Sequence, residues 1–143
     1  MMTNLAVALA WLLYQEAANQ PREGQRMVCD VIWNRAVIKQ GDVFNDLDLW
    51  YTITQRAQFS AVPDILRKPA GHMPPDDEAW RYCFKLASVM VGCAASGDTK
   101  SWKVKGPWTC YYNPKTAPWK PWMAKLIHIV DVADHRFGEE VFN

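Results

Sequence analysis

One carboxylic acid stands at the end of the first apolar segment of the chain. Residues 5–14 are almost entirely apolar, and Glu16 is the first residue with a formal side-chain charge. In a helix, Leu5, Leu9, Leu12 and Glu16 share one face, because they are spaced by three and four residues. Burial beside leucines disfavours a charged carboxylate, so we expect this acid to retain its proton. A protonated acid near neutral pH is suited to protonating a glycosidic oxygen. The alternative is an ordinary helix-terminal glutamate in solvent.

Length and composition predict one domain over residues 1–143. The chain is 50% hydrophobic and 22% charged, which is typical of a globular protein with one core. Its formal net charge of +1 creates no overall field that would require a nucleic acid or an anionic membrane as partner. Four cysteines form no Cys-x-x-Cys pair and the three histidines lack metal-ligand spacing. We therefore expect reduced, buried thiols, a monomer, no metal and no cofactor.

The apolar segment near the N-terminus has the length of a short secretion-signal core. It lacks the basic residues that precede such a core, since Arg22 is the first basic residue. It is also shorter than the roughly 20 residues that span a bilayer. We expect neither a cleavable export signal nor stable membrane insertion, and we predict that this segment is the first core helix.

Sequence patterns predict an α+β fold that is mainly helical, with a small β-hairpin near the C-terminus. Thr3 or Asn4 can cap a first helix that runs to about Gln20, where Pro21 forces a break. A loop-rich segment over 42–75 is expected to carry substrate contacts. Helices are predicted over 22–39, over 47–54 and from Asp76 and Asp77 to about 92. Strands are predicted over 108–112 and 126–132, with a partner strand over 140–142. The segment over 117–125 is predicted to form a turn or a short helix.

Short motifs follow one another in order along nearly the whole chain. They are Tyr14-x-Glu16-Ala17, Pro21-x-Glu23-Gly24-Gln25, Asn34-Arg35, Gln58-Phe59-Ser60, Gly97-Asp98-x-Lys100, Tyr112-Asn113-Pro114 and Gly138-x-x-x-Phe142. In this combination and order the sequence resembles the SleB-like cell wall hydrolases. The resemblance implies a lysozyme-like fold and cleavage of peptidoglycan glycan strands between N-acetylmuramic acid and N-acetylglucosamine. It places the family's acidic residue on Glu16.

The chain departs from the family pattern in two places. Where the family has Arg-Gly-Glu after the Glu-Ala pair, this chain has Ala18, Asn19 and Gln20, so an arginine and a second carboxylate are lost. The family's terminal histidine is replaced by Glu140. Asn34-Arg35 is interpreted first as a packing and pairing element at the end of a helix.

Sugars present apolar CH faces and N-acetyl groups, which aromatic rings and amides can bind. No Asp or Glu occurs from Ser101 to Lys125, so this aromatic-rich segment carries positive charge that would attract the carboxylates of a wall polymer. Its tryptophans could instead be core residues, and Gln58 and Asn113 could satisfy loop backbone. The aromatic and basic residues are Trp102, Trp108, Tyr111, Tyr112, Trp119 and Trp122 with Lys100, Lys103, Lys105, Lys115, Lys120 and Lys125. The expected substrate-binding residues are Gln58, Phe59, Ser60, Trp108, Tyr112, Asn113 and Glu140.

Only Glu16 is a strong catalytic candidate, since Glu23, Asp131, Asp134, Glu139 and Glu140 lie where solvated acids are common. One acid is sufficient in a lytic transglycosylase, because the muramic acid C6 hydroxyl supplies the nucleophile. The resemblance favours this route over a muramidase that uses a second carboxyl. The small size suggests a bacteriophage endolysin made in the host cytoplasm and acting on the cell wall, with lysis as the outcome. Two alternatives remain, which are a non-catalytic wall-binding protein and a nucleic-acid-binding module that uses the Trp and Lys residues.

Overall fold

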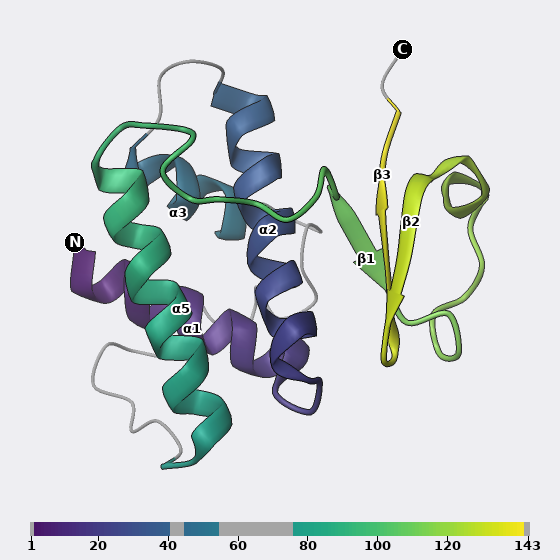
Figure 1. The fold of residues 1–143 in the computed structure, drawn as a ribbon, viewed down its shortest axis with the longest axis horizontal. Helices are drawn as coiled ribbons and strands as arrows, with labels where there is room; N and C mark the ends of the chain where they lie inside the picture. Colours follow the sequence, from purple (N-terminus) through teal and green to yellow (C-terminus); the bar gives the residue numbers. More distant parts are fainter. Residues whose placement is uncertain (1, 41–44, 55–75, 142–143) are drawn as a thin grey trace.

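The computed structural model describes residues 2–40, 45–54 and 76–141. Helices gather on one side of the molecule and a small antiparallel sheet lies on the other (Figure 1). This arrangement confirms the expected fold class, which is mainly helical α+β with a sheet near the C-terminus. The elements are α1 (Met2–Ala17), α2 (Arg22–Gln40), α3 (Asp46–Thr54), α5 (Glu78–Ala95), β1 (Cys110–Tyr112), the 3-10 helix η1 (Pro121–Lys125), β2 (Ile127–Val132) and β3 (His135–Glu139).

Helix α1 crosses behind α5 in Figure 1 and also contacts α2 and α3. Leu5, Leu9 and Leu12 on the predicted face are at most 1% exposed. Ala10, Leu13 and other residues on the remaining sides are also buried, which is typical of a core helix. The predicted apolar stripe is therefore confirmed, and Glu16 stands at its C-terminal end.

The first helix ends three residues earlier than predicted, at Ala17 instead of about Gln20. The side chain of Gln25 explains this end, because its Nε2 donates to the carbonyl oxygen of Ala17 at 3.1 Å and to that of Gln20 at 3.3 Å. These bonds satisfy carbonyl groups that a helix end leaves without partners. Pro21 then separates the turn from α2, which begins at Arg22 as predicted.

The other helices follow their sequence signals. Asp77 caps α5, since its carboxylate accepts a hydrogen bond from the backbone nitrogen of Trp80 at 2.7 Å. Trp80, Ala87 and Val91 are buried along one face of α5, whereas Phe84 is 37% exposed. Gly97 follows α5 with a φ of 80°, a conformation that glycine adopts without strain.

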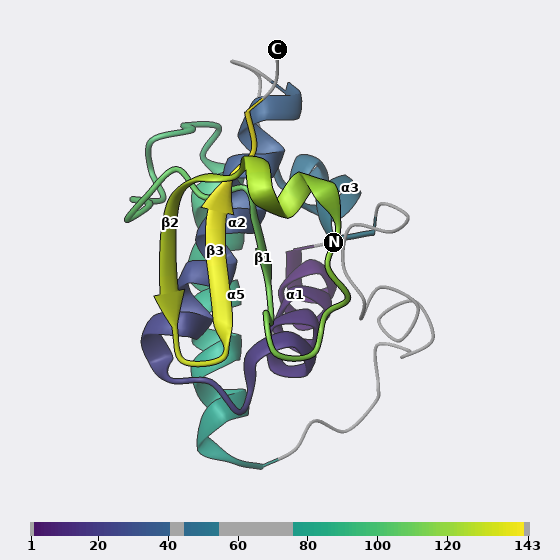
Figure 2. The same ribbon diagram turned by 90° about the vertical axis from the view of Figure 1, so that its right-hand side faces the viewer.

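The sheet has three strands in the order β1-β3-β2, and both pairings are antiparallel. The prediction of a partner strand over 140–142 was wrong, because β3 covers His135–Glu139 and follows β2 after a tight turn. The sheet also contains more than the predicted hairpin, because β1 pairs with β3 as a third strand. This pairing places Tyr111 opposite Phe137. Figure 2 shows the sheet in front of the helices, with β3 between its two neighbours.

The four cysteines are free thiols. Cys29, Cys83 and Cys110 are buried and Cys93 is half-buried. Burial raises the pKa of Cys83 and of Cys110 to about 12, so these thiols stay protonated and unreactive near neutral pH.

Candidate functional site

Glu16, at the C-terminal end of α1, lies close to strand β1 of the sheet. Glu16 is half-buried, and its carboxyl accepts a hydrogen bond from the hydroxyl of Tyr111 on β1. Burial is the main reason that the pKa of Tyr111 lies well above its usual value of 10.0, and the charge of Glu16 acts in the same direction. Tyr111 is therefore a protonated donor over the whole physiological range, and it orients the carboxyl of Glu16.

Arg35 brings a positive charge to the same place from α2. Its Nε donates a hydrogen bond to the carbonyl oxygen of Thr109, the residue that precedes β1. Burial lowers the pKa of Arg35, and the charges of Glu140 and Glu16 oppose this lowering. An arginine remains charged even so, and its guanidinium lies within electrostatic reach of both carboxyls.

Glu140 is held near Arg35 by the end of β3. Its backbone nitrogen donates to Oγ1 of Thr109 at 2.9 Å, and its side chain is half-buried. The charge of Glu140 adds to burial in raising the pKa of Cys110, while that of Arg35 opposes it. Glu140 therefore belongs to the surroundings of Glu16 and Arg35, although it replaces the histidine that the family pattern would place there.

His135 is a member of this group that sequence reasoning did not single out. Its ring centroid lies 5.1 Å from that of Tyr111 and 6.0 Å from that of Phe137. Burial lowers the pKa of His135 below its usual 6.5, and the charges of Glu16 and Asp134 oppose this shift. Strand alternation could have placed His135 and Phe137 on one face, but only after β3 had been located.

We call Glu16, Arg35, Tyr111, His135 and Glu140 the acid cluster. Its members come from α1, α2, β1, β3 and the segment after β3. Tyr111 was expected only as part of the aromatic segment, and Arg35 only as a packing residue. The structure brings them together because β1 pairs with β3 and because Thr109 receives hydrogen bonds from both Arg35 and Glu140.

Asn34, next to Arg35, has the packing role that the sequence suggested. Its Nδ2 donates to the carbonyl oxygens of Gly106 at 3.0 Å and Trp108 at 2.8 Å. These bonds attach the segment before β1 to the middle of α2. Asn34 and Arg35 together therefore fix the position of β1 relative to the helices.

Two of the predicted substrate-binding residues lie at the end of β1. Tyr112 is half-buried, and its ring meets that of Trp122 edge-on with the centroids 5.6 Å apart. The side-chain oxygen of Asn113 accepts a hydrogen bond from the backbone nitrogen of Lys115 at 2.9 Å. Asn113 thus stabilises its own turn, as the alternative interpretation of this amide proposed.

The tryptophans of the aromatic segment divide into two groups. Trp102 and Trp108 belong to the core, and Nε1 of Trp108 donates to the carbonyl oxygen of His128 at 2.9 Å. Trp108 is only 8% exposed, so its face is not available to a sugar and the core interpretation is favoured. Trp119 and Trp122 are 69% and 37% exposed, and they retain an accessible surface.

The predicted residues Gln58, Phe59 and Ser60 lie outside the described residues, as does Phe142. Most of the loop-rich segment over 42–75, where substrate contacts were expected, lies outside them too. Their assignment therefore stays a prediction from the sequence.

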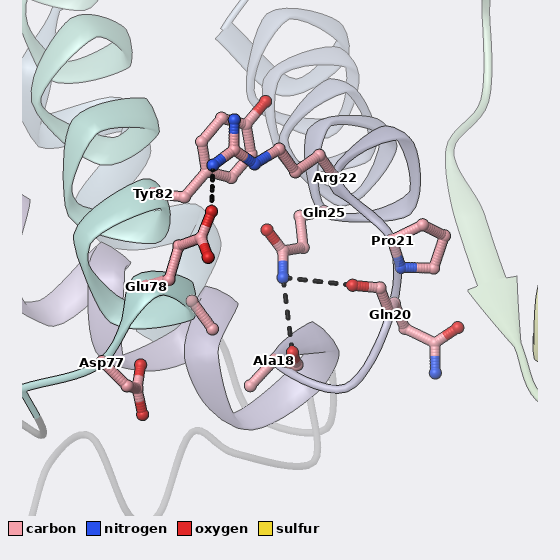
Figure 3. Close-up of a pocket in the computed structure, with 9 residues that line it drawn as sticks. Ala18, Gln20, Pro21, Arg22, Gln25, Asp77, Glu78 and Tyr82 are labelled. Carbon is pink, nitrogen blue, oxygen red and sulfur yellow. Dashed lines mark hydrogen bonds and ion pairs between the residues drawn. The ribbon is translucent and has the colours of Figure 1, made fainter.

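A pocket of about 460 Å³ lies between the α1–α2 turn and the start of α5 (Figure 3). Arg22 at its rim pairs with Glu78 at 2.6 Å and lies over the ring of Tyr82, with 4.8 Å between its Cζ and the ring centroid. On the opposite side, Nε2 of Gln25 bonds to the carbonyl groups of the turn. These contacts hold the turn against α5. The pocket is separate from the candidate catalytic acid, because Glu16 is not among the residues that line it.

The fold and the acid cluster define a small, mainly helical α+β protein organised around a half-buried carboxyl. A family model described as Cell Wall Hydrolase matches residues 19–138, so the chain belongs to the cell wall hydrolase family. Membership indicates a peptidoglycan-degrading enzyme that acts at the cell wall. The matched segment begins after Glu16, so the role of this residue has to be argued from its surroundings.

Two further comparisons, with curated proteins and with solved structures, found no significant match. Among the described residues, none of the helices combines the length and the apolar character that crossing a membrane requires.

Proposed function

We propose that this protein is a lytic transglycosylase that cleaves peptidoglycan glycan strands between N-acetylmuramic acid and N-acetylglucosamine. Glu16 is the catalytic acid and base. The observation that carries this assignment is the placement of a half-buried carboxyl within reach of a neutral phenol donor and a half-buried guanidinium. Membership of a cell wall hydrolase family supports the substrate class.

In the proposed reaction, protonated Glu16 gives its proton to the bridging glycosidic oxygen while the bond from that oxygen to C1 of the muramic acid breaks. The C6 hydroxyl of the same sugar attacks C1, and its proton returns to the enzyme. No water is consumed, and the product is a 1,6-anhydro sugar. The hydroxyl of Tyr111 and the charge of Arg35 stabilise Glu16 after it has lost its proton, which lowers the cost of the first step.

Substrate binding is proposed for Gln58, Phe59, Ser60, Tyr112, Asn113 and Glu140. Trp119 and Trp122 add exposed rings, and that of Trp122 meets Tyr112 at the end of β1. Trp108 is left out of this set because the core covers it. We further propose that the chain acts as one domain and a monomer, as a bacteriophage endolysin whose activity lyses the cell.

The test replaces Glu16 by Gln, which keeps the shape of the side chain and removes its exchangeable proton. We expect a loss of activity of at least about 10²-fold, the contribution typical of a general acid. The measurement is loss of turbidity of purified peptidoglycan. Glu23→Gln is the matched control, because Glu23 is an exposed acid on α2 and should be replaceable without effect.

Equal activity of Glu16→Gln and its parent would refute the proposal, and absence of activity in both would favour a non-catalytic wall-binding protein. Mass spectrometry of the released fragments separates the two enzymatic alternatives. Anhydro products are expected from a transglycosylase, whereas reducing ends, which contain one more water, would identify a muramidase.

A further inference from the structure

A second titratable group, the imidazole of His135, lies within electrostatic reach of Glu16. His135 is half-buried on β3, and its ring is held between Tyr111 and Phe137, with centroid separations of 5.1 Å and 6.0 Å. Tyr111 is also the residue that donates a hydrogen bond to Glu16. The imidazole is therefore fixed in place within the acid cluster by packing.

One ring nitrogen of His135, Nδ1, is not committed to a hydrogen bond within the described part of the fold. Nδ1 is buried and has no hydrogen-bond partner among the described residues. A structural histidine commonly uses one ring nitrogen to bond a carbonyl or carboxylate, and this bond fixes the tautomer. No such bond forms at Nδ1 among the described residues, so Nδ1 does not fix the tautomer of the ring.

We propose that His135 is the catalytic base that accepts the proton of the attacking hydroxyl, while Glu16 serves as the acid toward the leaving oxygen. This inference rests on the proposed function of Glu16. It assigns the two proton transfers of the reaction to two residues instead of one.

The steps balance as follows. Glu16 transfers its proton to the bridging oxygen, and the bond from that oxygen to C1 breaks with its electron pair remaining on the oxygen. The C6 hydroxyl oxygen forms a bond to C1, and its proton moves to the imidazole of His135. The imidazolium then returns a proton to the carboxylate of Glu16, which restores both groups without any other reactant.

Electrostatics in the cluster favour this order of events. While Glu16 is protonated, burial keeps His135 neutral and able to accept a proton. Once Glu16 has become a carboxylate, its charge favours the imidazolium, as does that of Asp134 in the turn before β3. Tyr111, which packs against the ring from β1, stays neutral. His135 therefore becomes a stronger base once Glu16 has lost its proton.

The experiment compares pH–rate profiles of the full chain and of His135→Gln and His135→Phe on purified peptidoglycan. Gln keeps a polar side chain that does not titrate, and Phe keeps a ring against Tyr111. We expect the parent to lose activity as the pH falls through the lowered pKa of His135, below 6.5. We expect both variants to be at least about 10²-fold slower and to lack this acidic limb.

A second measurement follows the imidazole of His135 by NMR, with His135→Gln used to assign its signal. Because the carboxylate of Glu16 favours the imidazolium, we expect a lower pKa for His135 in Glu16→Gln than in the parent. This readout needs no activity and uses a variant in which the histidine is intact.

Variants of His135 that keep the acidic limb and stay within about threefold of the parent rate would overturn the inference, as would a pKa of His135 unchanged by Glu16→Gln. If Glu16→Gln is inactive in that case, the proposed function survives and only the role of His135 fails. If Glu16→Gln is fully active, the proposed function itself fails.

Discussion

At the residue scale, the function proposed for Glu16 depends on groups that hold its carboxyl in one position. Tyr111 supplies a hydrogen bond, and its own ring packs against Phe137 with the centroids 5.7 Å apart. The phenol therefore has a packing role and a polar role, which can be separated by removing only the hydroxyl.

We predict that Tyr111→Phe lowers activity by about 10-fold to 100-fold, because a hydrogen bond to a charged group contributes roughly 1.5–3 kcal/mol. The ring remains, so the thermal unfolding midpoint should change little. Turbidity assays and circular dichroism measure the two quantities. Tyr51→Phe on α3 is the control, since Tyr51 is 62% exposed. A variant as active as its parent would show that this hydroxyl does not support the acid.

At the element scale, α2 is the support on which the acid cluster is assembled. Asn34 and Arg35 attach the segment before β1, and Asp30, one turn earlier, attaches the loop after α5. The carboxylate of Asp30 accepts hydrogen bonds from Nε1 of Trp102 at 2.9 Å and from the backbone nitrogen of Lys105 at 3.0 Å. Arg26 pairs with the same carboxylate at 3.5 Å.

We predict that Asp30→Ala lowers the free energy of unfolding by about 3–5 kcal/mol, because it leaves the partly exposed guanidinium of Arg26 and two hydrogen-bond donors without their partner. Urea denaturation measures this loss. Glu23→Ala on the same helix is the control and should be nearly neutral, since Glu23 is exposed. A loss below about 1 kcal/mol would mean that the loop is held in place by apolar packing alone.

Asp30 also makes stability depend on pH. Burial is the main reason that its pKa is raised above 3.8, and the bonds from Lys105, Trp102 and Arg26 oppose this shift. Because the pKa of Asp30 is higher in the folded than in the unfolded state, the stabilisation that comes from protonating Asp30 is complete below pH 3.8. It is lost as the pH rises through the pKa of the folded state. We expect Asp30→Asn to remove this dependence from urea denaturation curves recorded between about pH 3 and 7.

At the scale of the whole molecule, charge is distributed unevenly although its net value is small. The segment 101–125 contains lysines and no acidic residue, and Lys115, Lys120 and Lys125 are all exposed. These lysines lie in the same segment as the exposed rings of Trp119 and Trp122. A wall polymer that carries carboxylates would be attracted to this part of the surface.

We predict that replacing Lys115, Lys120 and Lys125 together by Gln weakens binding to peptidoglycan several-fold at about 0.1 M salt, where charges act over roughly 10 Å. At about 1 M salt, where this length is about 3 Å, parent and variant should bind alike. Co-sedimentation with the inactive Glu16→Gln background measures binding without digestion. Lys85→Gln on α5 is the control for a single exposed lysine elsewhere. Equal binding of parent and triple variant at low salt would exclude this attraction.

The sequence by itself determines the helices of this protein and the position of its acid. The periodic leucines, Pro21 and the cap residue Asp77 act through neighbours at most a few residues away, so local patterns predict α1, α2 and α5 closely. Glu16 could be placed on the apolar stripe for the same reason. Even the end of α1 was missed by three residues, because the side chain of Gln25 donates hydrogen bonds to the carbonyl groups of Ala17 and Gln20 from across the turn.

Only the tertiary structure decided what surrounds that acid. Tyr111 and His135 meet because β1 pairs with β3, and Gly138 permits Leu126 to pack there, since a Cβ on Gly138 would lie 2.9 Å from Cδ1 of Leu126. Arg35 joins them through the backbone of Thr109. Pairing between distant strands depends on such close contacts and leaves little trace in local sequence patterns. The neighbours of Glu16 could therefore be identified only in the folded molecule.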